Sequence, residues 1–267
     1  MMPEEAQPCV FWEHIYRYSF ATRYAKGQEI LDIACGEGYG SAALTQAGAK
    51  RVIGVDISRE TCDYARRKYG IEVRQGDATD IPIPDASVDL VVSFETIEHI
   101  AKPLEFIAEC HRVLRAGGTM IISTPNRDVY RERCKENAFH LSEMDLQEFA
   151  GACGTHFSFI RYFTQHPLTA PWWSIRAFAA DRWHPNPMHF INRSLRVARR
   201  GLDGLARADR IAVCRQNPVR AIIGPPRDGL CFLNQYLVRP LSARTPESPY
   251  FWLAVCTKAP SGGGHTH

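Results

Sequence analysis

Residues 30–41 read Ile-Leu-Asp-Ile-Ala-Cys-Gly-Glu-Gly-Tyr-Gly-Ser, an apolar strand that runs directly into a glycine-rich turn and then a helix. Gly36, Gly38 and Gly40 predict a tight turn that a ligand can approach with no Cβ in the way. The helix that follows presents free N–H groups and its positive dipole end to an anion lying there. This stretch therefore predicts a ligand site at the end of the first strand.

A second strand extends the same prediction. The run 51–56, Arg-Val-Ile-Gly-Val-Asp, is apolar and ends in Asp56, twenty residues after Gly36. An acid at this distance hydrogen-bonds ribose hydroxyls in α/β nucleotide-binding folds. A strand, a glycine turn, a helix and a second strand that ends in an acid together predict a nucleoside-cofactor site.

Two further carboxylates narrow the choice of cofactor. Asp32 lies inside the first strand, where a dinucleotide-binding strand is normally apolar. A buried carboxylate is costly unless it is paired, so a cationic amino group or backbone N–H groups are its expected partners. Asp77 follows a short third strand and offers an acceptor for an adenine amino group. Both acids argue against a nicotinamide dinucleotide, whose fingerprint the glycines only approximate.

Five segments in this order resemble the class I S-adenosylmethionine-dependent methyltransferases. They are 31–40 (Leu-Asp-Ile-Ala-Cys-Gly-Glu-Gly-Tyr-Gly), 54–57 (Gly-Val-Asp-Ile), 76–78 (Gly-Asp-Ala), 88–99 (Val-Asp-Leu-Val-Val-Ser-Phe-Glu-Thr-Ile-Glu-His) and 113–119 (Val-Leu-Arg-Ala-Gly-Gly-Thr). The resemblance implies that S-adenosylmethionine is the cofactor. It is closest to methyltransferases of bacterial glycan and natural-product pathways.

The same resemblance assigns roles to individual residues. The turn at Gly36, Gly38 and Gly40 would hold the methionine portion, with Asp32 beneath it, and Arg17 and Tyr18 would reach the methionine carboxylate. The remaining implied cofactor contacts are Asp56 with Ile57 at the ribose, Asp77 with Ala78 at the adenine, and Ser93 with Phe94 in the opposite pocket wall. Two alternatives stay open. The helix that carries Arg17 could be an amphipathic helix that only covers the site, and Asp77 could be an ordinary turn aspartate.

Two histidines follow strand ends and are candidate general bases for a hydroxyl acceptor, which must lose a proton. His99 ends the segment 95–99, after the fourth strand. His140 lies in 137–143, Asn-Ala-Phe-His-Leu-Ser-Glu, which resembles an Asn-Pro-Phe-His element of the glycan-pathway enzymes; Glu143 would orient it. The alternatives are that His99 only packs on the cofactor and that His140 is a tethered loop residue.

Strand and helix patterns alternate from residue 11 to about 163. The predicted helices are 11–26, 39–48, 58–69, 102–115 and 144–153, and the predicted strands are 29–34, 51–56, 71–75, 88–94, 118–124, 156–163 and 250–257. Such alternation produces right-handed crossovers and a sheet covered on both faces. We therefore expect an α/β fold, a Rossmann-like, doubly wound, mostly parallel seven-stranded sheet whose last strand is antiparallel.

The chain divides into a core and an insertion. Residues 1–163 form the predicted S-adenosylmethionine-binding core, 250–258 its final strand and 259–267 a flexible tail. The segment 164–249 breaks the pattern and carries thirteen Arg, no Lys and five acids, with helical spacing over 192–207. This Arg-rich insertion is expected to cover the substrate, dock an anionic partner or membrane surface, or build a homodimer; a solvated amphipathic helix is the alternative.

Composition excludes several other classes of protein. No apolar run reaches the roughly 18 residues of a membrane span, and the N-terminus lacks the features of a secretory signal, so a cytoplasmic location is expected. None of the nine cysteines forms a Cys-x-x-Cys pair, so neither disulfides nor a metal site are expected. Five of them are read as small buried hydrophobes: Cys35, Cys62, Cys110, Cys153 and Cys256.

The favoured function is methyl transfer to a hydroxyl of a small or lipid-linked, glycosidic acceptor. N- or C-methylation of a small metabolite is the main alternative; a nicotinamide reductase and a non-catalytic cofactor-binding scaffold are weaker ones. Enzymes that methylate base amines of nucleic acids carry Asn/Asp-Pro-Pro-aromatic after the fourth strand, where this chain has Ser93-Phe-Glu-Thr96. Nucleic acid is therefore not expected as a partner.

Overall fold

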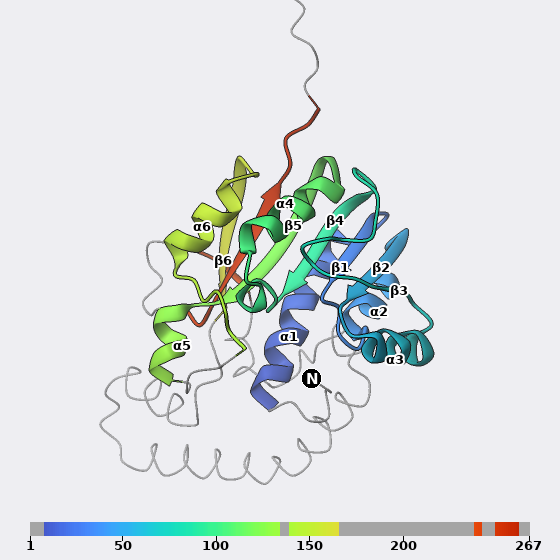
Figure 1. The fold of residues 1–267 in the computed structure, drawn as a ribbon, viewed down its shortest axis with the longest axis horizontal. Helices are drawn as coiled ribbons and strands as arrows, with labels where there is room; N and C mark the ends of the chain where they lie inside the picture. The colour runs from blue at the N-terminus through green and yellow to red at the C-terminus, as the bar shows by residue number, and fades with distance from the viewer. Residues whose placement is uncertain (1–7, 134–138, 166–237, 242–248, 262–267) are drawn as a thin grey trace, which may run out of the picture.

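The computed structural model describes residues 8–133, 139–165, 238–241 and 249–261, and within them one sheet carries the whole fold (Figure 1). Its strands are β1 (Glu29–Ile33), β2 (Arg51–Asp56), β3 (Glu72–Gln75), β4 (Val88–Phe94), β5 (Leu114–Pro125), β6 (Phe159–Gln165), β7 (Arg239–Pro240) and β8 (Phe251–Thr257). Their order across the sheet is β3-β2-β1-β4-β5-β8-β6-β7. Strands β1 to β5 are parallel, and β8 runs antiparallel between β5 and β6. The expected doubly wound sheet with an antiparallel last strand is confirmed.

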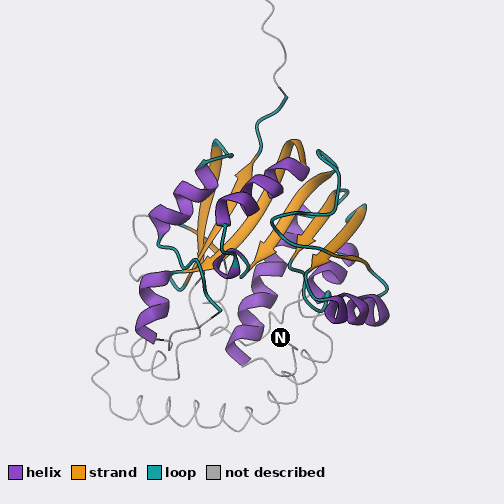
Figure 2. Cartoon of the chain, in the orientation of Figure 1, coloured by secondary structure: helices purple, strands orange, loops and turns teal. Residues whose placement is uncertain are grey.

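Helices cover both faces of this sheet (Figure 2). They are α1 (Pro8–Ala21), η1 (Thr22–Tyr24), α2 (Tyr39–Gln46), α3 (Arg59–Tyr69), η2 (Ile97–His99), α4 (Pro103–Val113), α5 (Arg127–Arg133) and α6 (Leu146–Gly154). Side chains alternate between the faces along each strand, and in β1 Ile30 packs with α1 and α2, whereas Leu31 packs with α4 and α6. Because both faces are buried, the strands read as unbroken apolar runs.

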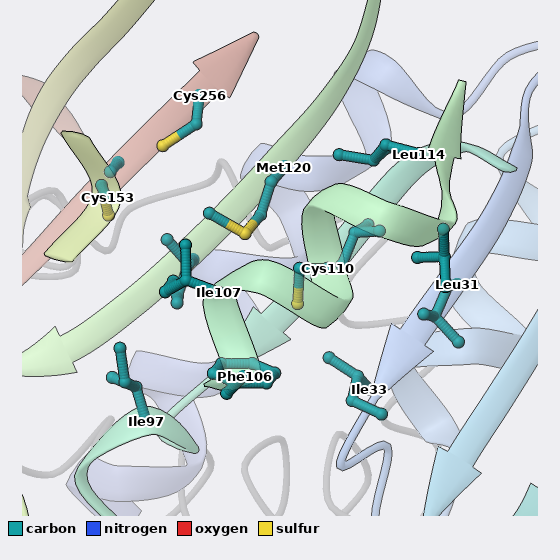
Figure 3. Packing of buried hydrophobic residues seen from close by; sticks show 14 of the residues in the cluster. Leu31, Ile33, Ile97, Phe106, Ile107, Cys110, Leu114, Met120, Cys153 and Cys256 are labelled. Carbon is teal, nitrogen blue, oxygen red and sulfur yellow. The ribbon is translucent and has the colours of Figure 1, made fainter. Parts of the chain in front are cut away.

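Buried apolar side chains form a hydrophobic cluster on each face of the sheet. The larger of the two lies under α4 and α6 (Figure 3). Phe106, Ile107 and Cys110 of α4 meet Leu31 and Ile33 of β1 there. The five cysteines predicted to be buried hydrophobes are all free thiols in the interior, which confirms that reading: Cys35, Cys62, Cys110, Cys153 and Cys256.

Four elements differ from the sequence prediction because they are short or shifted. Strand β7 has two residues and α5 has a largely charged sequence, so neither produces the apolar periodicity that reveals an element. Strand β5 begins at Leu114, before its glycine pair, and β6 runs from Phe159 to Gln165 instead of 156–163. Most of the insertion, including 192–207, lies outside the described residues, as does the tail beyond residue 261. None of the helices in the described part of the chain has the length and apolarity that a bilayer crossing requires.

Candidate active site

The glycine turn between β1 and α2 is fixed to the end of β2 by Asp56. The Gly36 N–H donates to Asp56 Oδ2 at 2.8 Å, and the Ser58 N–H donates to Oδ1 at 3.0 Å. Asp56 therefore holds both the turn and the start of α3, and its carboxylate stands between them with lone pairs left for further donors.

The structure requires glycine at each of the three turn positions for a different reason. Gly36 has a φ of +53°, and nothing lies within 4 Å of the position that a Cβ would take. A Cβ on Gly38 would meet Ala65 at 2.8 Å, and one on Gly40 would meet the Tyr18 ring at 2.1 Å. Only Gly36 leaves open space for a ligand; Gly38 and Gly40 allow close packing of protein on protein, a correction to the reason expected for them.

Asp32 is completely buried beneath this turn. The Tyr18 hydroxyl donates to Oδ1 at 3.1 Å and the Ser41 hydroxyl donates to Oδ2 at 2.6 Å. The expected cation or backbone N–H partners are thus replaced by two hydroxyls. Burial raises the pKa of Asp32 to about 7, and the two hydroxyl bonds only partly offset it. Asp32 ties α1 and α2 to β1 and so positions the turn.

Asp32 should make stability fall as pH rises from about 4 to about 7. Its pKa in the folded state is about 7, above the ordinary aspartate value of 3.8, so in this window the unfolded chain loses a proton that the folded chain keeps. The variant Asp32→Asn has no carboxyl group at this position, so its stability should lack this pH dependence. We expect urea unfolding to show the wild type losing stability relative to Asp32→Asn, by an amount on the order of a few kcal/mol, between about pH 4 and about pH 7. Parallel pH profiles for the two proteins would contradict this.

A cleft of about 430 Å³ opens at the carboxyl ends of β1, β2, β3 and β4. Five of the predicted site residues line it together: Asp56, Ile57, Asp77, Ala78 and His99. The Ile57 side chain is 69% exposed, and so presents an apolar surface to whatever enters. Asp77 accepts from the Thr79 backbone and hydroxyl through Oδ1, both at 2.8 Å, which lowers its pKa and leaves Oδ2 for an amino group. A second cleft, of about 310 Å³, lies at the opposite strand ends, around Gln28 and Gly117, and contains none of the predicted residues.

Two non-glycine residues in the cleft wall have left-handed backbone conformations. Ala34, after β1, has a φ of 56°, and Glu95, after β4, has a φ of 54°. Such conformations cost about 1–3 kcal/mol each and persist where the surrounding structure enforces them, often at functional sites. The sequence analysis had no signal for either, because neither residue type marks a positive φ.

The remaining predicted cofactor residues lie beneath the cleft. Ser93 and Phe94 are buried, and the wall from β4 is built by the next two residues, Glu95 and Thr96. Arg17 is also buried: its Nη1 donates to Gln165 Oε1 at 2.9 Å and lies 3.6 Å from Glu95 Oε1. Its Nε has no hydrogen-bond partner among the described residues, so one donor remains for a ligand.

A group of two histidines and two acids stands at the rim of the cleft. His140 Nδ1 lies 2.9 Å from Glu143 Oε1, and the His99 and His140 ring centroids are 4.9 Å apart. Glu98, which was not predicted as a site residue, is 1% exposed, and one of its oxygens lies within 4.8 Å of a ring nitrogen of each histidine. Burial, followed by the neighbouring charge of Glu95, raises the pKa of Glu98 well above its usual range.

Backbone hydrogen bonds bring His140 to His99 although the two are far apart in the sequence. The Glu98 carbonyl accepts from the N–H groups of Leu141 at 2.7 Å and Ser142 at 2.9 Å. The Ser142 hydroxyl donates to the Ile100 carbonyl at 2.8 Å. The segment after α5 is therefore docked onto η2, and no pattern in the sequence indicates this contact.

The residues present fit a nucleoside with a charged amino-acid tail. Asp56 offers acceptors for a ribose at the end of β2, and Ile57 offers an apolar face for a base. Asp77 offers an acceptor for its amino group, and the open backbone at Gly36 allows a close approach. S-adenosylmethionine combines these groups, so these four residues would hold it.

Comparisons with known proteins agree with this geometry. The methyltransferase domain family matches residues 31–122. A probable S-adenosylmethionine-dependent methyltransferase of Mycolicibacterium smegmatis is 38% identical over 141 residues, which are 52% of this chain and 54% of that protein. A ubiquinone biosynthesis O-methyltransferase of Cereibacter sphaeroides is 34% identical over 108 residues, which are 39% of this chain and 43% of that protein. The chain spans about half the length, or less, of these curated relatives.

A solved structure from Thermotoga maritima has the same fold. It is described as an S-adenosylmethionine-dependent methyltransferase and a possible histamine N-methyltransferase. It superposes with a TM-score of 0.54 over 92% of this chain and 93% of that chain, at 16% identity. At this identity the likeness concerns the fold alone.

Proposed function

We propose that this chain, whose core belongs to the class I S-adenosylmethionine-dependent methyltransferases and takes S-adenosylmethionine as its cofactor, methylates a hydroxyl group of a small or lipid-linked, glycosidic acceptor. One observation carries the proposal: His99 lines the nucleoside cleft and at the same time belongs to the group of Glu98, His140 and Glu143. A cofactor cleft that opens onto such a group suits an acceptor that must give up a proton.

The cofactor, when bound, supplies a methyl group on a positively charged sulfur. Asp56 and Asp77 orient the nucleoside at two ends of the cleft, and the turn at Gly36 fixes where the amino-acid tail lies. Methyl transfer is an in-line displacement, so most of the rate comes from holding the two reactants in line. The chain's main contribution is therefore a rigid cleft, fixed by Asp56 and by the buried Asp32.

The hydroxyl group explains why the histidines are needed. As the O–C bond forms and the C–S bond breaks, the hydroxyl proton must leave, because a neutral hydroxyl is a weak nucleophile, whereas a neutral amine is nucleophilic enough to attack before it loses a proton. His99 Nδ1 faces the Phe139 carbonyl at 2.8 Å, and His140 Nδ1 faces Glu143. The Nε2 atom of each imidazole is thus left for chemistry at the acceptor. N- or C-methylation of a small metabolite remains the alternative, and it would not use this group.

The surface around His140 supports an acceptor with an apolar part. Phe139 and Leu141, on either side of His140, are 77% and 61% exposed. Large exposed apolar side chains at the rim of a site favour an apolar partner, and the name of the Cereibacter relative records O-methylation. The glycosidic part of the proposal rests on the resemblance of 137–143 to glycan-pathway enzymes.

Replacing either rim histidine should slow turnover without weakening cofactor binding. We expect His99→Ala and His140→Ala each to lower kcat by about 10²–10⁴-fold, the usual contribution of proton transfer by a positioned group. The measurement is transfer of labelled methyl to hydroxyl-bearing acceptors from a screen of nucleotide sugars and glycosylated lipids. His156→Ala, which removes an exposed histidine outside the site, is the matched control and should keep full activity. Wild-type turnover in both rim variants would end the proposal that these residues act on the proton.

A further inference from the structure

Three side chains at the rim form a set of metal-ligand type. One ligand atom each from Glu98, His99 and His140 lies within 4.8 Å of the other two, and they are the one such group in the described part of the chain. Ligands of this kind bind an ion at about 2.0–2.2 Å and so stand within about 4 Å of one another. The three atoms thus lie farther apart than in an occupied site, so an ion would have to draw them together.

Both histidines are held as metal-bound histidines usually are. The Phe139 carbonyl can only accept, so His99 Nδ1, at 2.8 Å, must be the protonated nitrogen. The Glu143 carboxylate likewise accepts from His140 Nδ1. A neutral imidazole whose Nδ1–H donates to a carbonyl or carboxylate has its lone pair on Nε2, and this outer contact is typical of histidine ligands.

Glu98 supplies the observation that points to a cation rather than to a hydrogen-bonded histidine pair. It is 1% exposed, and neither carboxylate oxygen has a hydrogen-bond partner among the described residues. Its backbone carbonyl accepts from Leu141 and Ser142. A buried carboxylate without a partner is strongly unfavourable, so the fold retains it at a cost that a bound ion would remove.

The groups around Glu98 favour a cation. Glu95 and Glu143 are the carboxylates that act on it electrostatically, and Arg17 is the guanidinium that does so. The acidic groups thus outnumber the permanent cation, and a bound metal ion would add positive charge where it is needed.

We propose that Glu98, His99 and His140 bind a divalent first-row transition-metal ion, with an open coordination position toward the cleft that His99 lines. Two imidazoles and one carboxylate suit zinc, iron or cobalt, whereas magnesium and calcium favour oxygen ligands alone. Three protein ligands and one open position are also the usual form of a catalytic zinc site.

This inference rests on the proposed function and gives the two histidines the role of ligands instead of proton acceptors. An ion there would lower the pKa of an acceptor hydroxyl beside it, so that the hydroxyl loses its proton to solvent. The oxygen then forms a bond to the methyl carbon while the carbon–sulfur bond breaks. The products are a neutral methyl ether and neutral S-adenosylhomocysteine, so the charges balance.

The test is a titration of the chelator-stripped full chain with Co²⁺, followed by visible absorption, which reports the ligands directly. All proteins carry His265→Ala and His267→Ala, so that the tail histidines do not bind the ion. We expect saturable binding of about one equivalent, lost in His99→Ala and in Glu98→Gln, and about 10–100-fold weaker in Glu143→Gln, the usual effect of removing an outer contact. His156→Ala, whose ring pairs with His111 at 5.4 Å, is the control and should bind like the parent protein.

Unchanged Co²⁺ binding in His99→Ala, or no binding in the parent protein, would overturn the proposed site. His99 is exposed, so that variant decides the matter even if the buried Glu98→Gln does not fold. Calorimetry with S-adenosylhomocysteine on the same samples separates the two proposals. A protein that binds S-adenosylhomocysteine but no Co²⁺ loses only the metal site; one that binds Co²⁺ but no S-adenosylhomocysteine loses the proposed function and keeps the metal site.

Discussion

Gly40→Ala is expected to destabilise the fold severely, although it adds a single methyl group. The new Cβ would lie 2.1 Å from the Tyr18 ring, so the ring must move. Overpacking of this kind costs about 1–3 kcal/mol. Displacing Tyr18 also removes its bond to the buried Asp32, which adds about 1–3 kcal/mol. Chemical denaturation should therefore show a loss of several kcal/mol, a large share of the stability of a typical domain.

Gly151→Ala in α6 is the matched control. Nothing lies within 4 Å of the position that its Cβ would take, and a helical alanine is favoured over glycine by about 0.5–1 kcal/mol. This variant should be as stable as the wild type or slightly more stable. If Gly40→Ala proved equally harmless, the close packing of Tyr18 on the turn would be wrong.

Asp56→Ala is expected to remove most of the affinity for the cofactor. A hydrogen bond to a charged acceptor contributes about 1.5–3 kcal/mol, and a ribose offers two hydroxyls. The loss should be on the order of 10²–10³-fold in Kd for S-adenosylhomocysteine, measured by calorimetry. The turn also loosens, because the Gly36 and Ser58 N–H groups lose their acceptor.

Two further variants separate the ribose contact from a general effect of charge. Asp56→Asn keeps one carbonyl oxygen and should lose less affinity than Asp56→Ala. Asp63→Ala removes an exposed acid that pairs with Arg66 on the surface of α3, and it should bind as the wild type does. Equal binding by Asp56→Ala and the wild type would remove Asp56 from the cofactor site.

The sequence predicted the fold well because its signals are local. Unbroken apolar runs such as 88–94 predict doubly covered strands, and the glycines after Ile33 predict the turn. Asp56 and Asp77 were predicted as site residues because they lie at or just after strand ends, and Ile57 and Ala78 were implied by the family resemblance; all four line one cleft. A motif read along the chain is enough to bring such residues together.

The features that the sequence did not indicate depend on contacts between distant segments. Glu98 reads as an ordinary acid of a short helix until the segment around His140 docks on it. Gly40 was predicted to leave space for a ligand, but α1 places the Tyr18 ring against it. Arg17 was predicted as a ligand contact, but its hydrogen bond to Gln165 of β6 at 2.9 Å was not. Each depends on tertiary packing, which local patterns do not encode.

The most direct test of the central claim is a calorimetric titration of the wild-type chain with S-adenosylhomocysteine, run beside the same titration with NADH. If Asp56 binds the ribose and Asp77 the adenine in this cleft, as we propose, the chain should bind S-adenosylhomocysteine at micromolar concentration and NADH far more weakly. Preference for NADH, or binding of neither, would contradict the assignment of this cleft to a methyl donor.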